Sequence, residues 1–178
     1  AVNAGVPSVV MTYWNPIEKF GVKKFADAIA ARGGSGVIHP DITIEESSGW
    51  LAAASANGIN PIYVVAPSTS NERLAKVTSL AGGFVYAASI MGVTGARTSV
   101  SSGAEDLVGR VKAVTDLPVA VGLGVSTREQ AKDVAGYADG VIVGSAFVKA
   151  ILDAPTIDEG LAAVTALARE LSLGVRGQ

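Results

Sequence analysis

Six short apolar segments, rich in β-branched residues, recur along the whole chain and constrain its fold more than any other feature. They are apolar at nearly every position instead of every second one, which is typical of strands buried on both faces of a parallel sheet. Longer segments between them have the apolar spacing of amphipathic helices. We therefore predict alternating strands and helices, with strands at residues 8–13, 36–39, 61–66, 84–88, 118–122 and 140–144.

Sequence signals for helix starts fall between these strands. Ser or Thr followed three residues later by Glu is a capping-box pattern, in which each side chain bonds the backbone N–H of the other residue. Asn15 is a suitable cap residue, and Pro16 after it suits the first position of a helix. We therefore predict helix starts at Asn15 and at four capping boxes, formed by Thr43 with Glu46, Ser102 with Glu105, Ser126 with Glu129 and Thr156 with Glu159.

The alternation places the chain in the α/β class, and no linker interrupts it, so we predict a single domain over residues 1–178. An open doubly wound sheet and part of a (β/α)8 TIM barrel both fit this pattern. No G-x-G-x-x-G motif follows the first strand, which weakens the dinucleotide-binding version of the open sheet. A complete barrel typically needs about 250 residues. We therefore predict six βα units of an incomplete barrel.

Composition excludes several classes of function. The chain has no cysteine and one histidine, His39, which excludes disulfides, thiolate catalysis and cysteine- or histidine-rich metal sites. The formal net charge of −2 argues against nucleic-acid binding. The mean hydropathy is +0.40, but no apolar run approaches the roughly 18 residues of a membrane span. We expect a cytoplasmic protein that binds no metal, nucleic acid or membrane.

Two glycine-bearing strand ends near the C-terminus form the strongest local signal. They are VGLGV at 121–125 and GVIVGS at 140–145. Glycine lets backbone N–H groups approach a phosphate closely, and a short helix beginning at Ser145 would add free N–H groups and a positive dipole end. Barrel enzymes often bind phosphate after their last two strands. We predict a phosphate site here; the alternative is that the glycines serve only helix–strand packing.

Other candidate site residues are fewer. The segment 89–103 is rich in Gly, Ser and Thr and far exceeds the usual connection of about 4–6 residues, so it is either an active-site lid or an exposed loop without a role. Asp41 is the only carboxylate that directly follows a predicted strand, so the residues show no acid–base pair. We interpret His39 as a wall or interface residue and not as a catalyst.

Several motifs, taken in order, resemble the α subunit of tryptophan synthase. The stretch Tyr-x-x-Ser-x-x-Gly-Val-Thr-Gly, which begins at Tyr86, is highly specific, and the resemblance spans the whole chain. It implies that the chain begins at the end of the family's second helix, so that its strands correspond to the third through eighth of a (β/α)8 barrel. The motifs are VMTYWNP at 10–16, which is similar to actinobacterial members, APS at 66–68, GFVYAAS at 83–89, MGVTG at 91–95, VGLGV at 121–125 and DGVIVGS at 139–145.

The resemblance implies a function in tryptophan biosynthesis. The family cleaves indole-3-glycerol phosphate to indole and glyceraldehyde 3-phosphate by a retro-aldol reaction without a cofactor, and it passes indole to a PLP-dependent β subunit in an α2β2 assembly. Asp41, with Pro40, would lie near the β-subunit interface. The implied site consists of Gly124, Gly144 and Ser145 around the phosphate, Tyr13, Val64 and Leu123 around the indole, Tyr86 beside the catalytic centre and Thr94 in the lid as a supporting residue.

The resemblance also implies that the catalytic carboxylates lie upstream of Ala1, since the family takes them from its second strand and the loop that follows. Positioned proton-transfer groups each contribute about 10²–10⁴-fold, so we expect little lyase activity from this chain alone. The alternative is a non-catalytic barrel fragment that binds phosphate or a β subunit. Another phosphate-binding barrel, such as an indole-glycerol-phosphate synthase or a phosphosugar isomerase, would lack the stretch that begins at Tyr86.

Overall fold

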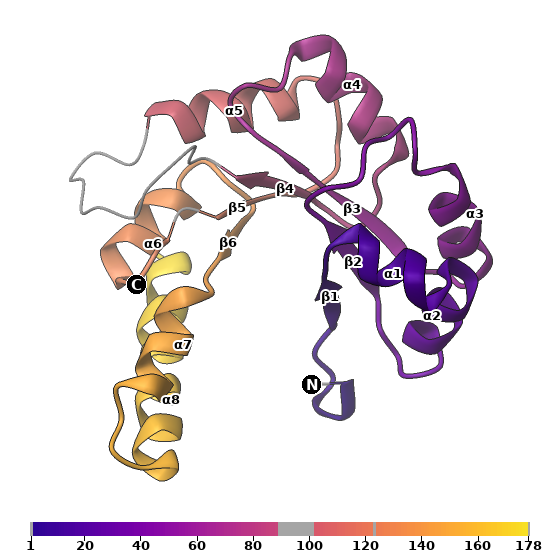
Figure 1. The fold of residues 1–178 in the computed structure, drawn as a ribbon. Coiled ribbons are helices and arrows are strands. Elements are labelled where there is room, and N and C mark those ends of the chain that lie inside the picture. Colours follow the sequence, from indigo (N-terminus) through magenta and orange to yellow (C-terminus); the bar gives the residue numbers. More distant parts are fainter. Residues whose placement is uncertain (1, 89–101, 123, 178) are drawn as a thin grey trace. The chain divides into compact units, whose positions relative to one another are not determined.

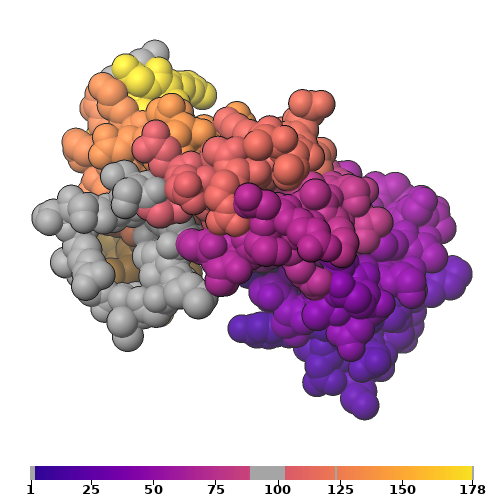
Figure 2. All heavy atoms as spheres, turned by 90° about the horizontal axis from the view of Figure 1, so that it is seen from above, coloured from indigo at the N-terminus to yellow at the C-terminus, as the bar shows by residue number. Residues whose placement is uncertain are grey.

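The computed structural model describes residues 2–88, 102–122 and 124–177; residues 1, 89–101, 123 and 178 lie outside the description and are grey in the drawings (Figure 1, Figure 2). All six predicted strands are present, with ends that differ from the prediction by up to two residues. The strands are β1 (Val9–Met11), β2 (Gly36–His39), β3 (Asn60–Val65), β4 (Val85–Ala88), β5 (Val119–Gly122) and β6 (Gly140–Ile142).

Helices separate successive strands, as the sequence predicts. A 3-10 turn at Val2–Ala4 precedes β1. The helices are α1 (Trp14–Phe20), α2 (Val22–Ala30), α3 (Ser48–Ala56), α4 (Asn71–Leu80), α5 (Ser102–Lys112), α6 (Arg128–Ala135), α7 (Ser145–Leu152) and α8 (Ile157–Val175).

The described chain divides into two compact units. The single domain expected over residues 1–178 stays a prediction. Unit 1 comprises Ala1–Val65, Thr69–Tyr86 and Val111–Leu117, and unit 2 comprises Ala66–Ser68, Ala87–Arg110 and Pro118–Gln178.

In unit 1 the strands follow one another in chain order, from β1 to β4. The pairs β1–β2 and β2–β3 are parallel, and His39 of β2 is the register partner of Tyr63 of β3. Helices α2 and α3 pack against each other beside these strands (Figure 1). Trp50 of α3 and Leu74 of α4 are fully buried and anchor the layer between helices and strands. Burial of such large side chains is the main stabilising contribution to a small unit.

Unit 2 contains the parallel pair β5–β6, in which Gly122 is the register partner of Ile142. Helix α6 connects the two strands, and α8 packs against both α6 and α7. The closest approach of α8 to α6 is at Gly174, where an added Cβ would lie 2.3 Å from the carbonyl oxygen of Arg128. A side chain at position 174 would therefore push α8 off the start of α6.

We expect Gly174→Ala to lower the free energy of unfolding by about 2 kcal/mol, because the new methyl group meets backbone atoms that cannot rotate away. The matched control is Gly109→Ala in α5, where an added Cβ meets nothing within 4 Å. That variant is expected to gain up to about 1 kcal/mol, since alanine favours a helix over glycine. Urea unfolding of both variants measures the difference; equal stabilities would contradict the close approach of α8 to α6.

The predicted helix starts have different outcomes. Thr156 caps α8, and its side chain accepts a hydrogen bond from the N–H of Glu159 at 3.2 Å. Helix α5 begins at Ser102. The box predicted at Ser126 is wrong by one residue, because α6 is capped by Thr127 with Gln130. Gln130 Oε1 accepts from the N–H groups of both Ser126 and Thr127, so the amide satisfies two donors at once.

Two predicted starts are wrong. Thr43 donates a hydrogen bond to Glu46 at 3.0 Å, but this pair closes a turn, and α3 begins later, at Ser48. Asn15 is not the cap of α1, because the helix already begins at Trp14. A carboxylate from another part of the chain binds the Trp14 N–H and makes that earlier start possible.

Candidate functional site

The strands of unit 1 bury one face against the helices and leave the other less covered. Tyr63 and Val65 of β3 are buried, whereas Val64 between them is half-buried. Tyr63 shares its face with its register partner His39, whose ring meets Trp50 of α3 edge-on with 4.7 Å between centroids. Successive side chains of a strand point to opposite faces. Val64 therefore points away from the helices, toward the less covered face.

Tyr86 follows the same pattern in β4. Its neighbours Val85 and Ala87 are fully buried, and Tyr86 is half-buried. Burial raises the pKa of the Tyr86 phenol, so the group keeps its proton at neutral pH. A neutral phenol can donate one hydrogen bond and accept another. Tyr86 therefore offers a neutral hydroxyl that can act as donor or acceptor.

Tyr13 lies between β1 and α1 and is 66% exposed. Its backbone is extended, with φ −71° and ψ 156°. Trp14 meets the His39 ring at 5.9 Å between centroids and therefore faces the helices. Three residues predicted on family grounds, Tyr13, Val64 and Tyr86, belong to unit 1.

Asp41 is the only carboxylate that lies within two residues after a strand in the described ranges. Its two oxygens accept hydrogen bonds from the backbone N–H of Trp14 at 2.9 and 3.1 Å. The group therefore caps α1, and no second carboxylate is paired with it. Sequence reasoning missed this contact. One signal could have found it: the residue before α1 is Tyr13, which is not a capping residue type and makes no side-chain hydrogen bond to the helix start.

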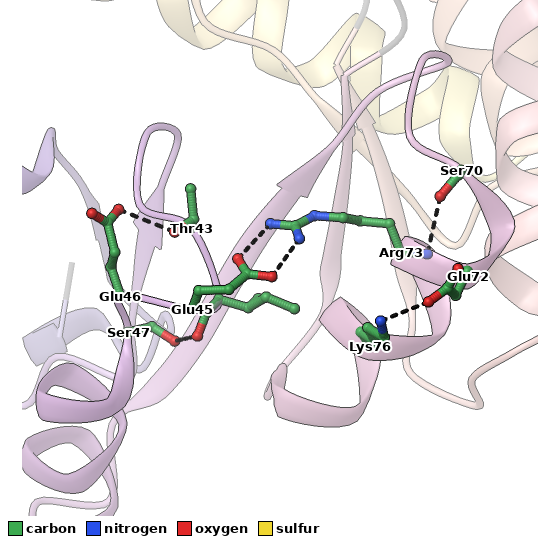
Figure 3. A network of polar contacts seen from close by, with 9 residues as sticks. Thr43, Glu45, Glu46, Ser47, Ser70, Glu72, Arg73 and Lys76 are labelled. Carbon is green, nitrogen blue, oxygen red and sulfur yellow. Dashed lines mark hydrogen bonds and ion pairs between the residues drawn. The ribbon is translucent and has the colours of Figure 1, made fainter.

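The loop between β2 and α3 is held in place by charged and polar contacts (Figure 3). Glu45 and Arg73 of α4 form a two-point ion pair, with N–O distances of 2.6 and 2.9 Å. Arg73 lowers the pKa of the Glu45 carboxyl to about 2. The hydroxyl of Ser47 donates to the carbonyl of Ile44 at 2.9 Å. This loop, which carries Asp41, is thus fixed at its far end to α4.

In unit 2, Gly124 and Gly144 lie at equivalent places after neighbouring strands. Gly122 and Ile142 are register partners, and each of the two glycines follows two residues later. Gly124 has φ +70°, a conformation that side chains rarely adopt. A Cβ at either glycine would meet nothing within 4 Å, and both residues are exposed. Open space next to bare backbone leaves room for a bound anion at both positions.

Ser145 begins α7, as predicted, and no side chain caps this helix, whose N-cap residue is Gly144. The N-terminus therefore offers N–H groups that helix geometry leaves unpaired, together with the positive end of the helix dipole. The neighbouring loop after β5 is held by Gln130 Oε1, which accepts the Ser126 N–H at 2.8 Å. A helix start with unpaired N–H groups suits a phosphate.

Two predicted site residues, Leu123 and Thr94, lie outside the described residues, as does most of the predicted lid at 89–103. Within the described ranges, no group of three or more histidine or acidic side chains could hold a metal ion. In the same ranges no helix is long and apolar enough to cross a membrane.

Comparisons with known proteins show the family of this chain. The sequence profile of the family described as "Tryptophan synthase alpha chain" matches residues 2–175. This chain belongs to the tryptophan synthase alpha chain family.

Relatives in the family are similar over almost the whole chain. The tryptophan synthase alpha chain of Streptomyces coelicolor is 57% identical over 174 residues, which cover 98% of this chain and 64% of the relative. That of Mycobacterium marinum is 55% identical and is covered to 62%. The chain therefore spans less than two thirds of the length of these family members.

Solved structures of the family have the same fold. A tryptophan synthase structure from Mycobacterium tuberculosis matches with a TM-score of 0.87 and 53% identity, over 98% of this chain and 65% of that one. A mutant tryptophan synthase alpha-subunit from Pyrococcus furiosus matches with a TM-score of 0.80 and 34% identity, over 97% of this chain and 67% of that chain. These matches confirm the predicted (β/α)8-barrel class, of which the described strands and helices form six βα units.

Proposed function

We propose that this chain is the substrate-holding part of a lyase that cleaves indole-3-glycerol phosphate to indole and glyceraldehyde 3-phosphate in tryptophan biosynthesis. The observation that carries the proposal is the pair Gly124 and Gly144. Each glycine follows two residues after one of the register partners Gly122 and Ile142, and Gly144 is the N-cap residue of α7, which no side chain caps. In this proposal both glycines and Ser145 bind the substrate's phosphate. Family membership supplies the identity of the rest of the substrate.

Tyr13, Val64 and Leu123 are the proposed wall of the indole pocket. Support comes from unit 1, where Tyr13 is exposed and Val64 points away from the helices. Aromatic and branched aliphatic side chains suit a flat apolar ring. Tyr86, whose phenol remains neutral, would stand beside the reacting part of the substrate. Thr94 is the proposed supporting residue of the lid.

Retro-aldol cleavage needs one group that removes a proton from the substrate and another that protonates the indole ring carbon. A pair of positioned acid–base side chains normally carries out these two proton transfers. Asp41 does not fit this task, because its carboxylate caps α1. We therefore propose that the acid–base carboxylates are not among these 178 residues and that this chain alone releases little or no indole. The reaction as proposed needs no cofactor.

The proposal includes a tryptophan synthase β subunit as partner and a cytoplasmic location, both on family grounds. It is tested by titrating the chain with indole-3-glycerol phosphate while indole release is followed. We expect saturable binding without release. Absence of binding by a folded chain would contradict the proposal, and release at the rate of a complete enzyme would contradict the assignment of the missing carboxylates.

A further inference from the structure

The backbone on both sides of Tyr13 is bonded to the neighbouring strand and its loop. On one side, the N–H of Thr12 donates to the carbonyl of Ile38 in β2 at 3.3 Å. On the other side, the N–H of Trp14 donates to both oxygens of Asp41, at 2.9 and 3.1 Å. Tyr13, which is 66% exposed, is the single residue between these two attachments. Its backbone is therefore fixed by β2 and by the loop that follows β2.

The Asp41 contact replaces a cap that α1 lacks. The N-cap residue is Tyr13, which makes no side-chain hydrogen bond to the helix start. Pro16, in the first turn, has no N–H to offer, so the Trp14 N–H is a principal donor at this end. A carboxylate is the strongest common acceptor for such a group and also favours the positive end of the helix. Asp41 is thus well suited to fix where α1 begins.

The starting residue of α1 decides which aromatic side chain faces which side. With the helix beginning at Trp14, the Trp14 ring packs on buried His39 at 5.9 Å between centroids, and Tyr13 stays 66% exposed. Without the Asp41 contact, the helix start can fray, and the extended conformation of Tyr13 is no longer enforced. The loop that carries Asp41 is itself anchored by the Glu45–Arg73 ion pair (Figure 3).

We propose that Asp41 is a positioning residue that orients Tyr13 against the indole ring and so determines affinity for the apolar half of the substrate. The inference rests on the proposed function, since it takes Tyr13 as part of the indole pocket. Asp41 acts here through the backbone of Trp14 and touches no substrate. The residues proposed to bind phosphate lie in unit 2 and have no part in this contact.

The test compares Asp41→Ala and Asp41→Asn in the 178-residue chain, with Asp116→Ala as a control that removes an equally exposed carboxylate of unit 1. Three quantities are measured: hydrogen exchange of the Trp14 amide by NMR, the Kd of indole-3-glycerol phosphate and the Kd of inorganic phosphate. For Asp41→Ala we expect Trp14 exchange and the Kd of indole-3-glycerol phosphate each to rise about tenfold, the scale of a lost helix cap. The Kd of inorganic phosphate should not change.

Asp41→Asn keeps one oxygen that can accept the Trp14 N–H, so it should recover most of the loss, and Asp116→Ala should behave as wild type. Unchanged Trp14 exchange in Asp41→Ala, or faster exchange with unchanged substrate affinity, would overturn this inference and would leave the proposed function intact. A parallel loss of inorganic phosphate affinity would also overturn it, by showing a general effect on folding. A wild-type chain that binds neither ligand would instead contradict the proposed function, and the inference with it.

Discussion

Replacing Gly124 by Asp is expected to weaken binding of inorganic phosphate to this chain by at least about 100-fold. The carboxylate would enter the open space beside the backbone, where a Cβ meets no protein atom, and would lie within a few ångströms of the bound anion. Two like charges at about 4 Å repel by roughly 4 kcal/mol near a protein surface, and each 1.4 kcal/mol is about tenfold in affinity. Isothermal titration calorimetry measures the change.

The matched control is Gly177→Asp, because Gly177 has the same φ of +70° and the same open surroundings but lies beyond the end of α8. It carries the same backbone conformation and the same added charge, but it belongs to neither of the two glycine loops. Its phosphate affinity should equal that of wild type. If Gly124→Asp and Gly177→Asp bound phosphate equally well, the two loops would serve packing alone, and the phosphate site would be refuted.

The stability of the folded chain is expected to fall by about 2 kcal/mol between pH 7 and pH 5 because of one residue, His39. Burial lowers its pKa from 6.5 to about 4, although the negative charge of Asp41 opposes this shift. The side chain is 1% exposed, and neither ring nitrogen has a hydrogen-bond partner among the described residues. Below pH 6.5 the unfolded chain therefore takes up a proton that the folded chain does not, and stability declines until pH reaches about 4.

Urea unfolding at a series of pH values measures this dependence through tryptophan fluorescence. The chain has two tryptophans, Trp14 and Trp50, and both flank His39. His39→Gln removes the titrating group, so its stability should change little between pH 7 and pH 5. This window lies above the carboxylate pKa values, which keeps acidic residues out of the comparison. The same decline in His39→Gln as in wild type would show that His39 does not keep its low pKa.

The sequence predicted the strands well because each strand depends on a local pattern. Each strand is a continuous apolar run, and Gly36–His39, buried at all four positions, was predicted to the residue. Gly124 and Gly144 stand out because glycine at a strand end has a specific conformational meaning. The assignment of Tyr13 and Val64 to the site depended on the family resemblance, because continuous apolarity conceals which residues of a strand face the helices.

Helix starts were predicted less well where two local solutions compete or where a distant group decides. Ser126 with Glu129 and Thr127 with Gln130 are adjacent candidates, and the amide of Gln130 prevails because it accepts from two N–H groups. Asn15 was predicted as a cap, but Asp41 reaches the Trp14 N–H from 27 residues further along the chain. No single-sequence pattern contains that contact, since it arises only when β1 and β2 pair.

The most direct test of the account is indole release from indole-3-glycerol phosphate, measured for this chain alone and for the chain joined to the first two βα units of a family member such as the Streptomyces coelicolor relative, which is 57% identical. We expect release from the joined protein and none above background from the 178 residues alone, with Gly124→Asp inactive in the joined form. Release by the chain alone, or none from a folded, substrate-binding joined protein, would contradict the claim that these residues hold the substrate while others cleave it.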